Sequence, residues 1–437
     1  MKKQRTFPFL IVLLTFVLFS VLALGCGGGG GGTAADPSAT TPGGDPTSTP
    51  TGGDQTPSPT PTPGVTREWT FMVYIACDNN LEYYDFQDVK EMESIGSTEN
   101  VNIIVQWDRM GFENSVDWSG SRRYYVNKDS QGSSGLVSTM MADLGPTNSG
   151  DPNTLVSFVQ WGVTNFPADK YGLVLWNHGS GWKKTEEFEV VKGICWDDTS
   201  NDHLTQAELR QALAQITTAT GGKLEFLGMD ACVMGMVEVA YDAKDYAKYL
   251  SFSEANEPGD GWNYEGFLDD LIANPSMNGG TLANHVVTAY GDYYAGYNTV
   301  TQSAVDLSKI DALVTAVNNF SNQGLSLMGT NRDDFNTCVQ NAATPSSNYV
   351  DLGDFCLQVV NNGNISDATM NTYAQAVITT IDNMVLSTYN GSTYSACQGL
   401  TIWIPSSADY SIYASSYQSL PFATDSTWDD FIQQLQQ

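Results

Sequence analysis

A histidine and a cysteine follow two separate strand-like segments of the chain, and together they could perform nucleophilic chemistry. His178 lies directly after residues 173–176, and Cys232 lies directly after residues 224–231. Both segments are rich in the apolar side chains of buried strands. In open α/β sheets, ligands bind beyond the carboxyl ends of the strands. A thiol placed there can attack a carbonyl carbon while a nearby imidazole accepts and returns the proton.

The residues around this pair favour the same chemistry. Residues 233–246 have helical spacing, so we expect Cys232 to open a helix whose N-terminus would stabilise a thiolate. Gly179 permits a close backbone approach, and its N–H could donate to an oxyanion. Taken alone, Cys232 could be a small buried side chain and His178 a structural residue. Their common placement at strand ends favours catalysis.

The remaining histidines and cysteines lack this context. His203 precedes a helix start and His285 lies within a helical stretch, so we expect both to be structural. The cysteines of the body without such surroundings are Cys77, Cys195, Cys338, Cys356 and Cys397. The sequence contains no CxxC or HExxH spacing, so a zinc site is not expected.

Strands and helices alternate along the chain from residue 69 onward. Strand-forming runs occupy residues 69–76, 101–107, 123–126, 173–176, 224–228 and 400–404. Helical spacing occupies residues 81–95, 154–166, 205–218, 233–246, 308–319, 371–386 and 428–435. Thr205 and Glu208 form a capping-box pattern at the start of one helix. This order predicts an α/β fold with a mostly parallel sheet covered on both faces.

Composition sets limits on the partners of the protein. The chain has 437 residues, 49 acidic and 19 basic, and a formal net charge of −30. This balance argues against nucleic-acid binding, which depends on Lys and Arg contacts with phosphates. The hydrophobic share of 41% is high enough for a large folded core.

The N-terminus reads as an export signal followed by a linker. Basic residues precede an apolar run at 7–24, which predicts a signal peptide over residues 1–25. The length of this run leaves an uncleaved anchor helix open. Cys26 ends a segment that resembles a bacterial lipoprotein box, so we expect it to carry a lipid; an ordinary cleaved signal is the alternative. Residues 26–65, rich in Gly, Thr and Pro, predict a disordered tether.

Several blocks of the sequence resemble the clostripain family of cysteine peptidases. The strongest are residues 177–182 (Asn-His-Gly-Ser-Gly-Trp), 228–236 and 257–262. Further likeness at residues 69–80, 107–109, 303–308 and 422–431 extends over nearly the whole body. The family is caspase-like and related to gingipains and legumains. The resemblance implies a three-layer α/β/α sandwich that forms one peptidase domain over residues 66–437. The alternative is that the residues from about 300 onward form a peripheral C-terminal part of this domain.

The resemblance also implies a role for individual residues. Cys232 matches the nucleophile and His178 the second member of a Cys–His dyad, with the amides of Gly179 and Cys232 as the oxyanion hole. Asp230 and Asp260 match the acids of a pocket that accepts Arg or Lys. A buried carboxylate would compensate a desolvated substrate cation. The alternatives are a helix N-cap for Asp230 and a turn residue for Asp260.

Activation and cofactors follow from the same resemblance. Family members are typically precursors that cut themselves between the dyad residues. Lys192 matches that processing site and Lys184 is a second candidate; an exposed charged loop is the alternative for both. The dyad chemistry requires no cofactor. Calcium is a further candidate because the founding member needs it, and residues 197–202 are oxygen-rich without an EF-hand pattern.

The sequence therefore predicts an exported or membrane-tethered cysteine endopeptidase that acts on peptides and proteins with Arg or Lys. It predicts contact with a membrane through the N-terminus and no nucleic-acid partner. One alternative is a non-catalytic surface-binding module on the same fold, which the presence of both Cys232 and His178 disfavours. Another is a caspase-like peptidase of different specificity, such as cleavage after Asn, which Asp230 and Asp260 disfavour.

Overall fold

A nine-stranded sheet organises the computed structural model, which describes residues 65–111, 118–182 and 193–437. The predicted signal peptide, all of the tether except Val65, and the residues Cys26, Lys184 and Lys192 lie outside the described residues. Within the described ranges, no helix has the length and apolar character needed to cross a bilayer.

The strands of the sheet lie in the order β12-β10-β9-β8-β5-β1-β2-β3-β4. They are β1 (Arg67–Cys77), β2 (Val101–Arg109), β3 (Gly120–Tyr125), β4 (Thr139–Gly145), β5 (Ala168–Trp176), β8 (Leu224–Asp230), β9 (Ala247–Phe252), β10 (Thr301–Asp306) and β12 (Val385–Asn390). The five central strands are parallel, and two strands at each edge pair antiparallel. The predicted α/β sheet is confirmed.

Alternating side chains of β1 pack into two separate hydrophobic cores, one on each face of the sheet. Trp69, Phe71 and Val73 belong to the core on one face of the sheet, whereas Met72 and Tyr74 belong to the core on the other face. All five are essentially buried. A strand buried on both faces reads as a continuous apolar run, which is why the sequence pattern identified it.

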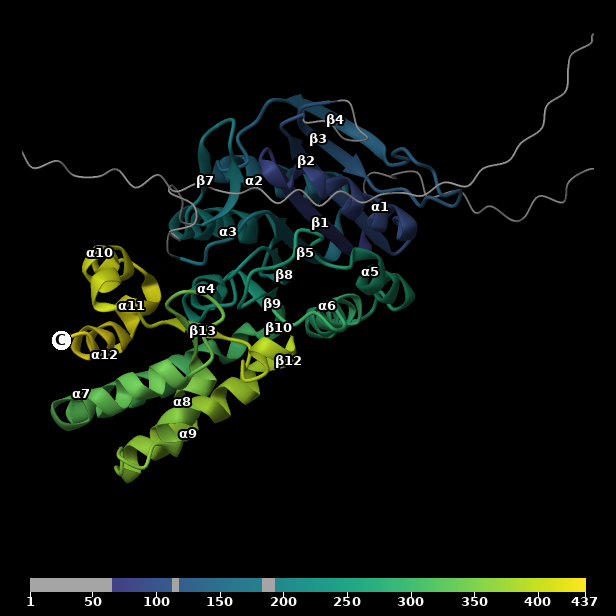
Figure 1. Cartoon of the computed structure of the whole chain (residues 1–437). Coiled ribbons are helices and arrows are strands. Elements are labelled where there is room, and N and C mark those ends of the chain that lie inside the picture. Colours follow the sequence, from purple (N-terminus) through teal and green to yellow (C-terminus); the bar gives the residue numbers. More distant parts are fainter. Residues whose placement is uncertain (1–64, 112–117, 183–192) are drawn as a thin grey trace, which may run out of the picture. The chain divides into compact units, whose positions relative to one another are not determined.

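Helices cover each of these two faces (Figure 1). The first face carries α1 (Asp85–Ile95), α5 (Tyr264–Ala273) and α6 (Gly279–Tyr293), and the second carries α2 (Pro152–Asn165), α3 (Gln206–Thr220) and α4 (Val237–Ala243). The capping box expected at the start of α3 is present, with Thr205 and Glu208 bonding each other reciprocally. The result is a three-layer α/β/α sandwich.

Residues after 300 contribute to the same sheet and to the second core. They supply β10 and β12, then the mutually packed helices α7 (Ile310–Asn341), α8 (Leu352–Asn361) and α9 (Ala368–Met384) (Figure 1). The last helices are α10 (Ser407–Tyr417), α11 (Pro421–Asp425) and α12 (Trp428–Leu435). Phe431 of α12 packs against Phe320 and Phe335 of α7, which ties the end of the chain to this layer.

Small elements complete the described structure. Two separate two-stranded sheets are formed by β6 (Ile194–Asp197) with β7 (Asp202–Leu204), and by β11 (Tyr349–Asp351) with β13 (Thr401–Trp403). Short 3-10 turns occur at η1 (Asn80–Tyr83), η2 (Leu307–Lys309) and η3 (Ser392–Tyr394). Strand β13 corresponds to the predicted run at 400–404, but it lies outside the main sheet.

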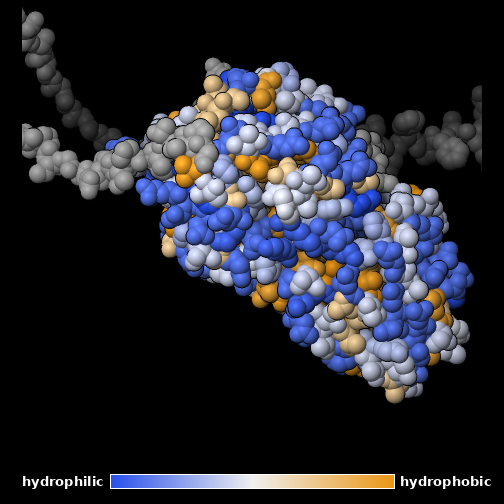
Figure 2. Space-filling model, turned by 180° about the vertical axis from the view of Figure 1, so that it is seen from behind, coloured by the Kyte–Doolittle hydropathy of each residue, from blue (hydrophilic) through white to orange (hydrophobic). Residues whose placement is uncertain are grey.

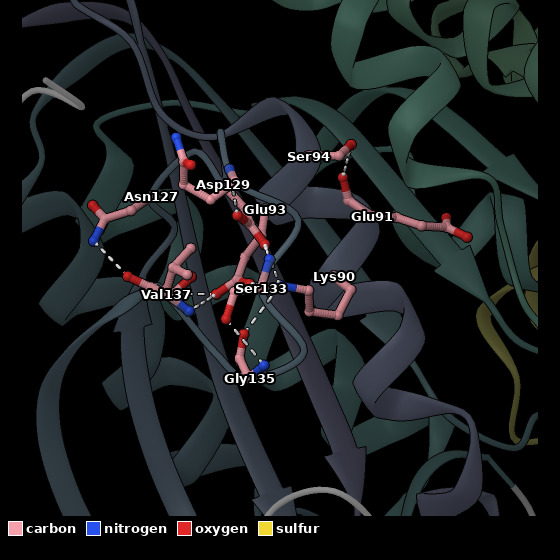
Figure 3. A network of polar contacts seen from close by, with 11 residues as sticks. Lys90, Glu91, Glu93, Ser94, Asn127, Asp129, Ser133, Gly135 and Val137 are labelled. Atoms are coloured by element: carbon pink, nitrogen blue, oxygen red, sulfur yellow. Dashed lines mark hydrogen bonds and ion pairs between the residues drawn. The ribbon is translucent and has the colours of Figure 1, made fainter. Parts of the chain in front are cut away.

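A polar network fastens α1 to the chain beyond β3 (Figure 3). Lys90 Nζ lies 2.7 Å from Glu93 Oε2 and 2.8 Å from Asp129 Oδ2, and it also donates to the carbonyl of Gly135. Glu93 Oε1 accepts from the backbone N–H of Val137. Elsewhere, hydrophilic residues cover most of the face seen in Figure 2, in keeping with the large net charge.

Candidate active site

The backbone that carries His178 is held by the residue before it. Asn177 is buried directly after β5, and its Oδ1 accepts from the N–H of Trp196 at 2.7 Å. Its Nδ2 donates to the carbonyl of Ala76 in β1 and, at 3.3 Å, to that of Trp196. One amide side chain thus ties together the ends of β1, β5 and β6, so His178 leaves the sheet from a fixed position.

The imidazole of His178 is half-buried between a polar and an aromatic neighbour. Its Nε2 lies 2.7 Å from Oδ1 of Asn80, and its ring centre lies 5.4 Å from that of Trp196. An amide oxygen only accepts, so Nε2 carries the proton and Nδ1 is the basic nitrogen. Burial lowers the pKa of His178 to about 4. The ring is therefore neutral at pH 7 and able to accept a proton.

Cys232 does not open a helix, contrary to the expectation from sequence. Helix α4 begins at Val237, five positions later, because the intervening backbone follows another path. Val233 has φ of 52°, and the N–H groups of Val233 and Gly235 donate sideways to the segment after β9. Met236 is extended and bridges to Thr401. The helix-dipole argument for a stabilised thiolate therefore does not apply here.

A backbone amide of another loop contacts the sulfur instead. The N–H of Glu257 donates to Sγ of Cys232 at 3.3 Å, and Sγ lies 3.8 Å from the carbonyl oxygen of Glu257. The cysteine side chain is half-buried. An N–H directed at the sulfur favours the anionic form of the thiol.

Gly179 and Cys232 are in direct backbone contact. A Cβ added at Gly179 would lie 2.4 Å from the carbonyl oxygen of Cys232 and 3.0 Å from Cβ of Ala231. Only glycine permits this approach. Gly179 forms an antiparallel bridge with Ile194, and the bridge uses the N–H of Ser180, which donates to Gly193 at 3.1 Å. The two loops that carry His178 and Cys232 are therefore packed against each other.

A pocket opens between these loops. Its lining residues are Leu81, Trp176, Asn177, His178, Asp230, Ala231, Cys232, Glu257, Pro258, Gly259 and Gly261. It lies at the carboxyl ends of β5 and β8, with Leu81 from the turn after β1, and the chain order of the sheet reverses between β1 and β5. Ligands usually bind at this end of such sheets. Both members of the predicted dyad thus face one cavity.

Asp230 supplies a buried carboxyl group to this pocket. It is the last residue of β8 and is 4% exposed, so it is not the helix N-cap considered from sequence. Its Oδ2 accepts from the N–H of Trp262 at 3.2 Å and from the hydroxyl of Tyr264 at 2.9 Å. Burial raises the pKa of Asp230, because the charged form loses its hydration.

Asp260 occupies a different position from Asp230. It is exposed on a turn in which the N–H of Gly261 donates to the carbonyl of Pro258 at 3.1 Å. The turn itself lines the pocket through Pro258, Gly259 and Gly261, with the ring of Tyr84 against Gly259. The described structure therefore brings Asp230, Cys232 and His178 together, with Asp260 on the rim.

Two residues at this site were not identified from the sequence. Asn80 follows β1 and reaches His178, and Glu257 contacts Cys232 from the loop after β9. Asn80 could have been found by the rule that located His178, since it follows the strand beside β5. Asn80 begins a turn that also contains Glu82, and Glu82 pairs with Arg109 at 2.6 Å. The side chains of Glu82 and Arg109 are both fully buried.

The segment proposed for calcium has other bonding partners. Asp197 accepts backbone N–H groups from Ser149 at 2.9 Å and from Ser200 at 2.7 Å. Asp202 accepts from the side chain of Asn148. Within the described part of the chain, the side chains grouped closely enough for a metal are Glu254, Asp351 and Cys397, and a thiol does not suit calcium. The group of Glu254, Asp351 and Cys397 therefore does not fit a calcium site.

Solved structures define the class of this fold. An X-ray structure of a secreted C11 cysteine protease from Bacteroides thetaiotaomicron, in complex with an irreversible peptide inhibitor, is 23% identical. It covers 83% of this chain and 99% of its own, with a TM-score of 0.61. An X-ray structure of an inactive zymogen C11 protease from Parabacteroides distasonis is 19% identical. The match covers 83% of this chain and 98% of that one, with a TM-score of 0.63. The chain has the fold of these cysteine proteases.

The sequence comparisons define the family. Clostripain from Hathewaya histolytica is 30% identical over 227 residues, which cover 48% of this chain and 43% of that protein. The match thus spans less than half the length of that relative. The model of the clostripain family, peptidase C11, matches residues 73–435. The chain therefore belongs to the clostripain family of cysteine peptidases.

The low pKa of His178 leads to a prediction about its titration. A histidine with a pKa lowered to about 4 stays neutral as the pH falls from 8 to 5. We expect the ring resonances of His178 in an NMR titration to stay constant over that range. Comparison with His178→Gln assigns the signals, and a midpoint near 6.5 would contradict the burial of the ring.

Proposed function

We propose that the protein is a cysteine endopeptidase that cleaves after Arg or Lys through Cys232 and His178, with residues 66–437 as the peptidase domain. Membership of the clostripain family supports the chemistry. The observation that carries the proposal is one pocket lined by a half-buried thiol, a neutral imidazole and a buried carboxyl group.

The proposed reaction begins with the thiol of Cys232. Its proton moves to Nδ1 of His178, and the sulfur attacks the scissile carbonyl carbon. The N–H groups of Gly179 and Cys232 stabilise the resulting oxyanion. His178 then protonates the leaving amine, and water hydrolyses the thioester with His178 again as the base. The contact of Asn80 with Nε2 supports this tautomer of His178.

The proposed specificity depends on acids in and around the pocket. Asp230 lies inside the pocket and Asp260 at its rim, so a long cationic side chain could contact the first and pass the second. A desolvated guanidinium or ammonium group needs a nearby carboxylate to compensate the loss of water. The buried position of Asp230 supports Arg or Lys over Asn.

We also propose self-processing and attachment to the cell envelope. Lys192, with Lys184 as the second candidate, follows His178 and precedes Cys232 in the chain, where a cut would leave both dyad residues intact. Cys26 would carry the lipid, and the tether would hold the peptidase away from the membrane. The substrates are then peptides and proteins outside the cytoplasm.

The first test separates the candidate functions. Purified protein is incubated with fluorogenic peptides that end in Arg, Lys or Asn. We expect turnover of the Arg and Lys peptides and its loss in Cys232→Ala, because the nucleophile is removed.

Cys356→Ala is the matched control, since this cysteine is buried in α8. We expect it to keep its activity. Absence of turnover in the intact protein would favour a binding module, and preference for the Asn peptide would overturn the role of Asp230.

The second test uses the contact between Gly179 and Cys232. In Gly179→Ala, the new methyl group must push the nucleophile loop away and displace the oxyanion donors. We expect kcat to fall by at least about a hundredfold, as when an oxyanion donor is lost. Gly222→Ala is the control, since a Cβ there meets nothing within 4 Å. Equal activity of the two variants would exclude Gly179 from the oxyanion hole.

The third test concerns the processing site and uses mass spectrometry of the purified chain. We expect the wild-type protein to be cut after Lys192 and Cys232→Ala to stay intact, because the nucleophile performs the cut. Lys192→Gln should remove that fragment, and Lys184→Gln should leave it unchanged. A Cys232→Ala chain that is still cut after Lys192 would show that another protease is responsible.

A further inference from the structure

A second carboxyl group lies beside Asp230 in the pocket. Glu257 lines the same pocket, and its Oε1 accepts from Nε1 of Trp262 at 3.2 Å. The carboxyl groups of Asp230 and Glu257 lie within hydrogen-bonding reach of each other. Trp262 contacts both, since its backbone N–H donates to Asp230. The two acids therefore form a fixed pair facing the cavity.

We propose that Glu257 is a further specificity-determining residue: it shares one proton with Asp230 while the pocket is empty, and the cationic side chain of the substrate displaces that proton. This inference rests on the proposed function.

The hydrogen bonding of the pair requires a proton. Oε2 of Glu257 is buried with no hydrogen-bond donor among the described residues. Two adjacent carboxylates repel each other, whereas a carboxyl group and a carboxylate form a strong hydrogen bond. Burial raises the pKa of Glu257 well above its usual value, and the negative charge of Asp230 raises it further. Burial also raises the pKa of Asp230, so the two acids titrate as a unit with one shared proton.

The surroundings of the pair do not replace this proton with a cation. Within the described structure, no lysine or arginine lines the pocket. Asp88 and Glu91 of α1 lie near Asp230, and burial raises the pKa of both. The other titratable groups near the pair are Cys232, Tyr264, Tyr290 and Tyr294, and His178 lines the same pocket. In the absence of a cation, a shared proton is thus what relieves the repulsion between the two carboxyl groups.

Substrate binding then becomes an exchange of one positive charge for another. The guanidinium or ammonium group enters, the proton between Glu257 and Asp230 leaves to solvent, and both carboxylates pair with the cation. No covalent bond to carbon changes. Because the cation binds the fully ionised pair, its affinity increases as the pH rises through the titration of the pair. A neutral side chain of equal shape gains nothing from this change.

The backbone and side chain of Glu257 have separate roles, which makes the inference testable. The backbone N–H and carbonyl contact Cys232, whereas the carboxyl group contacts Asp230 and Trp262. Replacement by glutamine keeps the backbone and an oxygen for Trp262, and it removes the shared titration. We expect KM to rise and kcat to be preserved.

The experiment compares wild type with Glu257→Gln on matched peptides that end in Arg or in citrulline, the neutral isostere of Arg, between pH 5.5 and 8.5. In the wild type we expect KM for the Arg peptide to fall as the pH rises. In Glu257→Gln we expect KM at pH 8 to rise about tenfold, the effect of one charge-assisted contact. Its pH dependence should flatten while kcat stays within about twofold.

A direct measurement uses benzamidine, an amidinium ligand, and the wild-type protein. Calorimetry at pH 7 in two buffers of different ionisation enthalpy should report release of about one proton on binding, since the pair titrates as a unit. Glu257→Gln should release none. Glu238→Gln is the control, because Glu238 is also buried with a pKa raised to about 7, away from the pocket.

Each outcome distinguishes the inference from the proposed function. Binding of benzamidine by the wild type without proton release would overturn the inference, whatever the stability of the variant. An unchanged preference for Arg over citrulline in folded Glu257→Gln would do the same. Equal cleavage of Arg and citrulline peptides by the wild type would instead overturn the proposed Arg and Lys specificity.

Discussion

The parallel pairing of β5 with β8 is the constraint on which the candidate site depends. Its register places Trp176 opposite Asp230, the last residue of each strand. His178 and Cys232 each follow two residues later, so the sheet delivers them together. A shift of one residue would turn Asp230 to the opposite face of the sheet and displace both Asp230 and Cys232 relative to His178. The register thus fixes the spacing of Asp230, His178 and Cys232 before any side-chain contact forms.

Acidic residues serve two purposes in this chain. Exposed acids are part of the hydrophilic surface, and Figure 2 shows hydrophilic residues over most of the face that it draws. Asp88, Asp230 and Glu257 are instead grouped at the pocket, supported by indole and hydroxyl donors. Grouping like charges in a site of low polarity is costly unless protons or cations neutralise them. The proposed recognition of a basic side chain would offset that cost.

The sequence predicted the features that depend on local patterns. Continuous apolar runs identified β1, β2, β5 and β8, and strand-end position identified His178 and Cys232. Strand β4 was missed because it is largely exposed and has no such run. The start of α4 was misplaced because N–H groups near Cys232 bond to a distant segment. Glu257 was missed as a pocket residue for a related reason: its partner Asp230 is 27 positions away, and only the fold brings them together.

The loop of Cys232 also depends on a very distant part of the chain. The N–H of Thr401 donates to the carbonyl of Gly235 at 2.9 Å, and Met236 forms a bridge with the same residue. During synthesis, both dyad residues emerge long before Thr401. The loop of Cys232 therefore reaches its final geometry only after the segment that carries Thr401 has been made. The local geometry around Cys232 is thus completed by a segment that is synthesised more than 160 residues later, and folding of the two segments is coupled.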